Sequence, residues 1–160
     1  MGMSNQNRSV IRAEMIVQLR CFSSGAILFN QKVADRVGLH LTDMQCMNLL
    51  DMVGTSTPGK LASCMGLTTG GVTVMLDRLE KAGCIKREPN PDDRRSVLVR
   101  VNARKMVKIN AHYAGLAEEL DAYLLTLPQT DIETMVDFFK HLNALRLNAA
   151  IAGFTGGNKP

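Results

Sequence analysis

The segment from residue 67 to residue 102 constrains the fold of this chain more than any other part of the sequence. An apolar stripe at helical spacing predicts an amphipathic helix over residues 69–82. Two short candidate strands follow, Cys84–Arg87 and Ser96–Val101, joined by a charged turn that holds two prolines. Because valines occupy alternate positions of the second strand, it is expected to be half buried. The segment therefore predicts a helix followed by a β-hairpin. The helical stripe consists of Val72, Met75, Leu76 and Leu79.

The residues before this segment carry the start and stop signals of two further helices. Thr42 is the expected N-cap of the first helix, which a glycine ends at position 54. Thr57 and Pro58 begin a short second helix through residue 65, because threonine caps well and proline fits the first helical position. Gly66 closes that helix and Thr68 opens the next. Two helices with a tight glycine-containing turn form a helix-turn-helix, so residues 42–102 are predicted to be a winged helix-turn-helix.

Long helices are expected on both sides of this region. From Arg8 to Val37, apolar residues recur at alternating spacings of four and three, as in a coiled-coil seam. A helix over residues 103–125 is expected to stop before Pro128, and a last helix is expected to begin at Asp131 as its N-cap. The predicted fold is a single domain over residues 1–160, mainly α with a small β wing, in which 8–41 and 103–150 are dimerisation helices. Dimer contacts are expected at Met15, Leu19, Phe22, Ile132, Val136, Phe139 and Leu142.

Charge is unevenly distributed along the chain. The net charge is +4, but residues 78–108 hold ten Lys or Arg against four acids. Such a concentration indicates contact with a polyanion, and the alternative is an ordinary solvated face. The seven Phe and Tyr residues all lie outside this stretch. Since single strands and RNA loops are usually held by stacking on aromatic rings, their absence favours duplex DNA.

Other parts of the sequence argue against a secreted, membrane or metal-binding protein. The four cysteines have no Cys-x-x-Cys spacing and are expected to be reduced thiols in a cytoplasmic protein. No signal peptide or membrane-length apolar run is apparent. His40, His112 and His141 lie far apart, so no metal or other cofactor is expected.

The face of the 69–82 helix opposite its apolar stripe is suited to approach DNA. The side chains on this face are small at the start of the helix and basic toward its end. Gly70 permits close approach of DNA to the start. Thr73 and Val74 are expected to contact base edges or a thymine methyl, and Arg78 to contact guanine or phosphate. The alternative for the helix alone is an amphipathic element without a ligand.

The hairpin is expected to make a second contact with DNA. Its two prolines hold Arg94 and Arg95 away from the body, where an arginine suits the narrow minor groove. Lys86 and Arg87, at the base of the hairpin, are expected to contact phosphates. The alternative is a solvent-exposed turn in which Asp92 and Asp93 neutralise the arginines.

The run LTTGGVTVMLDRLEKAGCIKREPNPDDRRSVLVRVN resembles the recognition helix and wing of the MarR family of bacterial transcriptional regulators. The resemblance implies that Arg95 enters the minor groove and that Asp93 braces the tip by pairing with a nearby arginine. It also implies that Thr69, Thr73 and Arg78 lie on the major-groove face. Thr68, at the start of the helix, is expected to contact DNA as well. The chain departs from the family pattern at Val74, where many relatives are basic, and at Asn102, where threonine is common, although asparagine can also cap the next helix.

The resemblance further implies a two-fold homodimer on a pseudo-palindromic operator, and release from DNA by an unidentified small molecule. Met15, Met44 and Met47 are candidates for an adaptable effector pocket, with ordinary core as the alternative. Cys21 is a candidate redox sensor, since it lies beside the seam of the first helix, whereas Cys46, Cys64 and Cys84 occupy core phases. A Cys21→Ser protein that still releases DNA on peroxide treatment would contradict the redox hypothesis.

The predicted function is a sequence-specific, duplex-DNA-binding transcriptional regulator, a repressor released by a small molecule or an oxidant. The alternative is a winged-helix protein-interaction module with no operator, although such a module has no need of arginines on a stiff tip. An enzyme is not expected, because the adjacent acids at 92–93 and 118–119 point apart and no phosphate loop or nucleophile motif is present.

Overall fold

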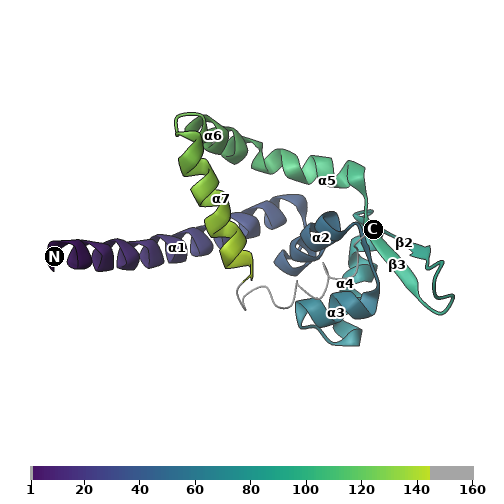
Figure 1. Ribbon diagram of the computed structural model, residues 1–160. Coiled ribbons are helices and arrows are strands. Elements are labelled where there is room, and N and C mark those ends of the chain that lie inside the picture. Colours follow the sequence, from purple (N-terminus) through teal and green to yellow (C-terminus); the bar gives the residue numbers. More distant parts are fainter. Residues whose placement is uncertain (1, 145–160) are drawn as a thin grey trace. The chain divides into compact units, whose positions relative to one another are not determined.

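The computed structural model describes residues 2–144, with side chains described from residue 7 onward (Figure 1). Leu145 and the rest of the predicted dimerisation segment 145–150 lie outside the described residues. The chain divides into two compact units, Met1–Met44 and Gln45–Pro160. The boundary lies near the predicted start of the winged region at residue 42, and each unit is described separately below.

The first unit is dominated by one long helix, α1, Gly2–Val37. Gly38 ends it in the left-handed conformation, φ 70°, and the Leu39 N–H donates to the Ala34 carbonyl at 2.9 Å. Val33, Ala34 and Leu39 are buried, whereas most of the apolar side chains earlier in α1 are exposed. The predicted helix is confirmed, and it begins several residues earlier than the sequence pattern indicated.

Helix α2, Leu41–Val53, starts one residue before the position predicted. The predicted N-cap, Thr42, is wrong, because Thr42 lies inside the helix. The Asp43 carboxylate instead accepts the His40 N–H at 3.1 Å and stabilises the start of the helix. The predicted glycine stop is confirmed, since Gly54 has φ 79°.

The next two helices confirm the predicted helix-turn-helix. In α3, Pro58–Met65, Thr57 is the N-cap, and its hydroxyl accepts the Lys60 N–H at 3.3 Å. Gly66 closes α3 with φ 64°. In α4, Thr69–Lys81, Thr68 is the N-cap, and its hydroxyl accepts the Gly71 N–H at 3.1 Å. The residue types that mark helix ends therefore acted locally, as the sequence predicted.

The sheet has three antiparallel strands in the order β1-β3-β2. They are β1, Thr55–Ser56, β2, Ile85–Pro89, and β3, Val97–Val101. Strands β2 and β3 form the predicted hairpin, with Arg87 opposite Val99. Strand β1 was not predicted, because two residues show no strand periodicity. Val99 is fully buried at the centre of β3, whereas Val97 is exposed, so only the middle of the expected valine alternation faces the core.

The core of the second unit joins α2, α3, α4 and the sheet. The predicted apolar stripe of α4 is confirmed, since all four of its residues are buried. The remaining buried apolar residues from position 45 onward are Cys46, Met47, Leu49, Leu50, Leu61, Ala62, Cys84, Ile85, Val99, Met106 and Ile109. Because this core lies under one side of α4 and under β3, the other side of α4 and the hairpin tip are left to solvent.

Asn102 connects the wing to the C-terminal helices. Its amide Nδ2 donates to the Gly83 carbonyl at 2.9 Å, and its Oδ1 accepts the Arg104 N–H at 3.2 Å. It is therefore the N-cap of α5, Ala103–Asn110. The prediction that asparagine can cap a helix at this position is confirmed.

The predicted single helix over residues 103–125 is wrong. This segment instead forms α5, a 3-10 turn over Ala111–Tyr113, and α6, Ala114–Leu124. Asn110, His112 and Tyr113 have weak helix propensity, and they lie where the division occurs.

The predicted N-cap of the last helix is also wrong. Helix α7, Gln129–Ala144, begins directly after Pro128, and the Asp131 N–H already donates to the Pro128 carbonyl at 3.0 Å. Asp131 thus lies in the first turn, where its negative carboxylate interacts favourably with the positive end of the helix dipole. Within residues 2–144, no helix combines the length and hydropathy that a membrane span requires.

Candidate nucleic-acid interface

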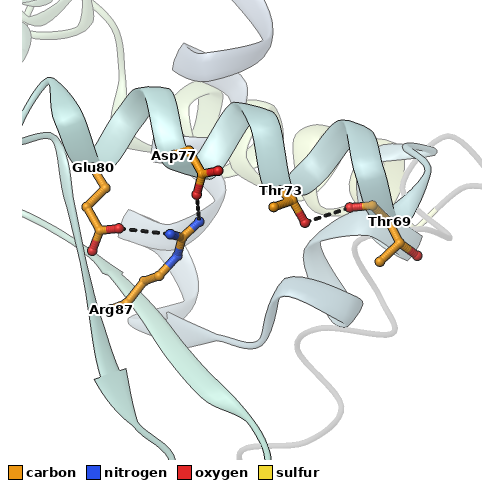
Figure 2. Close-up of polar contacts among 5 residues, drawn as sticks. All are labelled: Thr69, Thr73, Asp77, Glu80 and Arg87. Carbon is orange, nitrogen blue, oxygen red and sulfur yellow. Dashed lines mark hydrogen bonds and ion pairs between the residues drawn. The ribbon is translucent and has the colours of Figure 1, made fainter.

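One face of α4 carries a row of polar side chains in the order Thr69, Thr73, Asp77 and Glu80 (Figure 2). The Thr73 hydroxyl donates to the Thr69 carbonyl at 2.9 Å, so its oxygen remains able to accept a hydrogen bond from a ligand. We call these four residues the reader row. The Thr68 hydroxyl oxygen accepts the Gly71 N–H as the N-cap of α4, which leaves its O–H able to donate to a ligand.

Two glycines follow Thr69 at the start of α4, and they differ in their surroundings. A Cβ at Gly71 would lie 3.2 Å from the Thr68 hydroxyl oxygen, so glycine relieves crowding at the cap. A Cβ at Gly70 would have nothing within 4 Å. The exposed surface at Gly70 is therefore free for a partner to approach the helix backbone closely.

The residues next to the reader row differ in exposure. Val74 is 63% exposed, although a valine with no partner normally gains by burial. Lys81 is exposed, and Arg78 is partly buried. The start of α4 is thus small and uncharged, and its basic residues lie toward the C-terminal end, as the sequence indicated.

Arg87 joins the hairpin to α4. Its Nη2 lies 2.7 Å from the Asp77 Oδ1, and its Nη1 lies 2.8 Å from the Glu80 Oε2 (Figure 2). The guanidinium predicted to contact phosphate is therefore held by two carboxylates of the reader row. Glu80 was not among the residues predicted for this site. The sequence does hold one sign of the contact, since Asp77 and Glu80 lie three residues apart on a helix that is followed directly by the strand of Arg87.

The turn between β2 and β3 is braced by hydrogen bonds. The Asn90 amide donates to the Ser96 hydroxyl at 2.7 Å, and the Asp93 carboxylate accepts the Arg95 N–H at 3.0 Å. Within residues 2–144, Asp93 takes part in no ion pair, so it braces the tip through the main chain and not by pairing with an arginine as expected. Arg94 and Arg95 are both exposed.

A hollow of about 500 Å³ lies between the start of α3 and the hairpin turn. Sequence reasoning could not find it, because its two sides are about thirty residues apart along the chain. Arg95 and the first residues of α3 line it together. The lining residues are Thr57, Pro58, Gly59, Asn90, Asp93, Arg95, Ser96 and Val97.

The cysteines divide by burial. Cys46 and Cys84 are buried, as expected for core residues, but Cys64 is only partly buried, and burial raises the pKa of its thiol. A raised pKa leaves less of the reactive thiolate at neutral pH. Cys21 is exposed on α1 in a shallow hollow with Val17, Arg20 and Ser24. Cys21 is thus the most accessible thiol among the described residues.

The methionines proposed for an effector pocket also divide. Met44 and Met47 are buried, at 1% and 0% exposure, whereas Met15 is half exposed. Met44 and Met47 therefore belong to the core.

Apolar side chains remain uncovered on the helices predicted to form a dimer. On α1, Phe22 is 64% exposed, and on α7, Val136 and Phe139 are 46% and 48% exposed. Leu19, Ile132 and Leu142 are partly exposed. Further exposed apolar residues on α1 and α6 are Val10, Ile11, Met15, Ile16, Val17, Ile27, Leu28, Leu116, Leu120 and Tyr123.

Comparison with known proteins identifies the winged region. Residues 39–97 match the model of the MarR family. Over 98 residues the chain is 40% identical to the HTH-type transcriptional regulator YcgE of Bacillus subtilis, which covers 61% of this chain and 64% of that protein. The chain therefore spans somewhat less than two thirds of this relative.

Solved structures share the fold. The transcriptional regulator Tm0710 from Thermotoga maritima has a TM-score of 0.60 at 23% identity, over 82% of this chain and 92% of that one. Wild-type MarR from E. coli, in its apo form, has a TM-score of 0.57 at 20% identity, over 78% of this chain and 93% of that one. The match to the MarR family model thus covers α2, α3, α4 and most of the hairpin, and the chain shares the winged helix-turn-helix fold of these solved structures.

Proposed function

We propose that this chain is a transcriptional regulator that binds a specific duplex DNA sequence as a homodimer. One observation carries the proposal. The second unit presents two exposed elements, the start of α4 and a braced hairpin tip with Arg94 and Arg95, and the tip lies within the basic stretch 78–108. A helix fits the major groove and an arginine on a projecting loop fits the minor groove.

In the proposed complex the start of α4 enters the major groove. Gly70 allows close approach, Thr69 and Thr73 offer hydroxyls to base edges, and Val74 contacts a thymine methyl. Thr68 and the first N–H groups of α4 lie toward phosphate, where the helix dipole favours negative charge. Arg78 contacts guanine or phosphate farther along the helix.

Two copies of the chain would place two such surfaces on one pseudo-palindromic operator. The uncovered apolar residues of α1 and of α6–α7 support a second copy as their partner, because a soluble monomer rarely leaves so many exposed on regular helices. The regulator is proposed to act in the cytoplasm as a repressor, without catalysis. A small molecule or oxidation of Cys21 would release it.

The class of nucleic acid is tested by competition. A labelled random-sequence duplex is bound at low salt and displaced with unlabelled duplex or with single strands of the same sequence. We expect the duplex to compete at least about tenfold better, since residues 78–108 contain no aromatic ring for base stacking. Equal competition by single strands would contradict the proposal.

A further inference from the structure

The ion pairs of Arg87 place a cation of the wing on the DNA-facing helix. Nη2 is bound by Asp77 and Nη1 by Glu80, so two separate N–H groups engage two separate carboxylates. The Arg87 side chain is 25% exposed, against 59% for Asp77 and 42% for Glu80. The planar guanidinium suits this double contact, which a lysine ammonium could not reproduce in the same geometry.

The two carboxylates lie in line with the residues proposed to read bases. Asp77 follows Thr73 by four positions and Glu80 follows Asp77 by three, so all share one face of α4 (Figure 2). Two uncompensated negative charges on this face would repel DNA phosphates. They would also repel each other along the helix. Arg87 offsets one of these two charges and ties β2 to α4 at the same point.

We infer that Arg87 is a positioning residue, which neutralises Asp77 and Glu80 on the reader row and fixes the wing to α4, and that it is not a phosphate contact. The inference rests on the proposed DNA-binding function. It assigns the phosphate contact at the base of the wing to Lys86 instead. Lys86 points to the opposite side of β2, is exposed, and forms no ion pair within residues 2–144.

The test compares Arg87→Ala with Lys86→Ala. Affinity for one duplex is measured across a range of salt concentrations, because each phosphate contact contributes about 0.9 to the slope of log K against log salt. Lys86→Ala should lower the slope by about that amount. Arg87→Ala should weaken binding roughly tenfold, the scale of one unpaired charge near the interface, and leave the slope unchanged.

Rescue separates neutralisation from direct contact. The triple variant Asp77→Asn, Glu80→Gln, Arg87→Ala lacks both the arginine and the charges it covers, so it should regain most of the lost affinity. Arg100→Ala is the matched control, since Arg100 pairs with Glu88 at 2.7 Å on the two strands, away from α4. It should change affinity less than about twofold, as exposed pairs contribute little.

Several outcomes would overturn the inference: a slope that falls in Arg87→Ala as in Lys86→Ala, a triple variant as weak as the single one, or an equal loss in Arg100→Ala. Unchanged affinity in Arg87→Ala would also overturn it. If Arg87→Ala does not fold, Arg87→Gln, which also removes the positive charge but keeps more of the side chain, gives the same slope test. A wild-type chain that binds no duplex would overturn the proposed function as well, whereas the other outcomes contradict only the role of Arg87.

Discussion

Replacing Arg95 by alanine is expected to weaken binding to the operator by about 1–3 kcal/mol, which is roughly a five- to 150-fold rise in Kd. The Arg95 side chain is exposed, and its backbone N–H is held by the Asp93 carboxylate at 3.0 Å. Because the turn is already ordered, little conformational entropy is lost when the arginine enters a groove. Fluorescence anisotropy with the operator and with a scrambled duplex measures both affinity and specificity.

The loss in Arg95→Ala should be larger for the operator than for the scrambled duplex, because a groove contact carries sequence information and a phosphate contact does not. Arg12→Ala is the control, since it removes the same charge from an exposed position on α1. We expect that control to change affinity less than about twofold, because an exposed charge outside the proposed interface is screened at physiological salt. Unchanged operator affinity in Arg95→Ala would remove the minor-groove assignment.

Replacing Phe139 by aspartate is expected to separate the proposed dimer. Phe139 is 48% exposed on α7 and forms an edge-to-face pair with Phe138 at 5.6 Å between ring centroids. Aromatic residues often dominate an interface, and a buried unpaired carboxylate is strongly unfavourable, so the dimer should lose about 2–4 kcal/mol. Light scattering at micromolar concentration should give about twice the 17.5 kDa chain mass for the wild type, and a lower value for the variant.

Thr134→Asp is the matched control for Phe139→Asp. Thr134 is exposed and lies five positions earlier on α7, on the far side of the helix from Phe139. It introduces the same charge and should leave the dimer intact. A wild-type chain that is monomeric at micromolar concentration would contradict the dimer itself, and an intact dimer in Phe139→Asp would contradict only the place of this residue in the interface.

The parts of the fold that were predicted are those governed by local chemistry. Threonine caps at 57 and 68, Pro58, and glycines at 54 and 66 define helix ends through their own hydroxyls, rings or backbone freedom. The buried stripe of α4 follows from helical periodicity alone. These features need no knowledge of distant residues.

The features that were missed depend on residues far apart in sequence, or on competition between neighbours. Strand β1 exists because Thr55 and Ser56 pair with Arg100 and Val99, more than forty residues later. Thr42 does not cap α2, because the helix begins at Leu41 and the Asp43 carboxylate accepts the His40 N–H at its start, although threonine is also a good cap.

The candidate site was predicted in composition but not in its internal contacts. The exposed glycine, threonines and wing arginines lie where the sequence placed them on α4 and the hairpin. The pairing of Arg87 with Asp77 and Glu80 was not predicted, because side-chain partners across a helix and a strand depend on packing geometry. The Asp93 carboxylate likewise accepts a main-chain N–H of the tip and does not pair with an arginine side chain. Spacing along the sequence cannot decide between these two local partners.

Selection from a pool of random duplex DNA tests the central claim most directly, with the wild-type chain at ~150 mM salt, near physiological ionic strength. We expect enrichment of a pseudo-palindrome whose half-sites lie about one helical turn apart, because two reader helices related by a two-fold axis meet the same face of the duplex. Weak, salt-sensitive binding with no enriched sequence would contradict an operator-binding regulator. It would leave residues 78–108 as a general polyanion surface on a protein-interaction module.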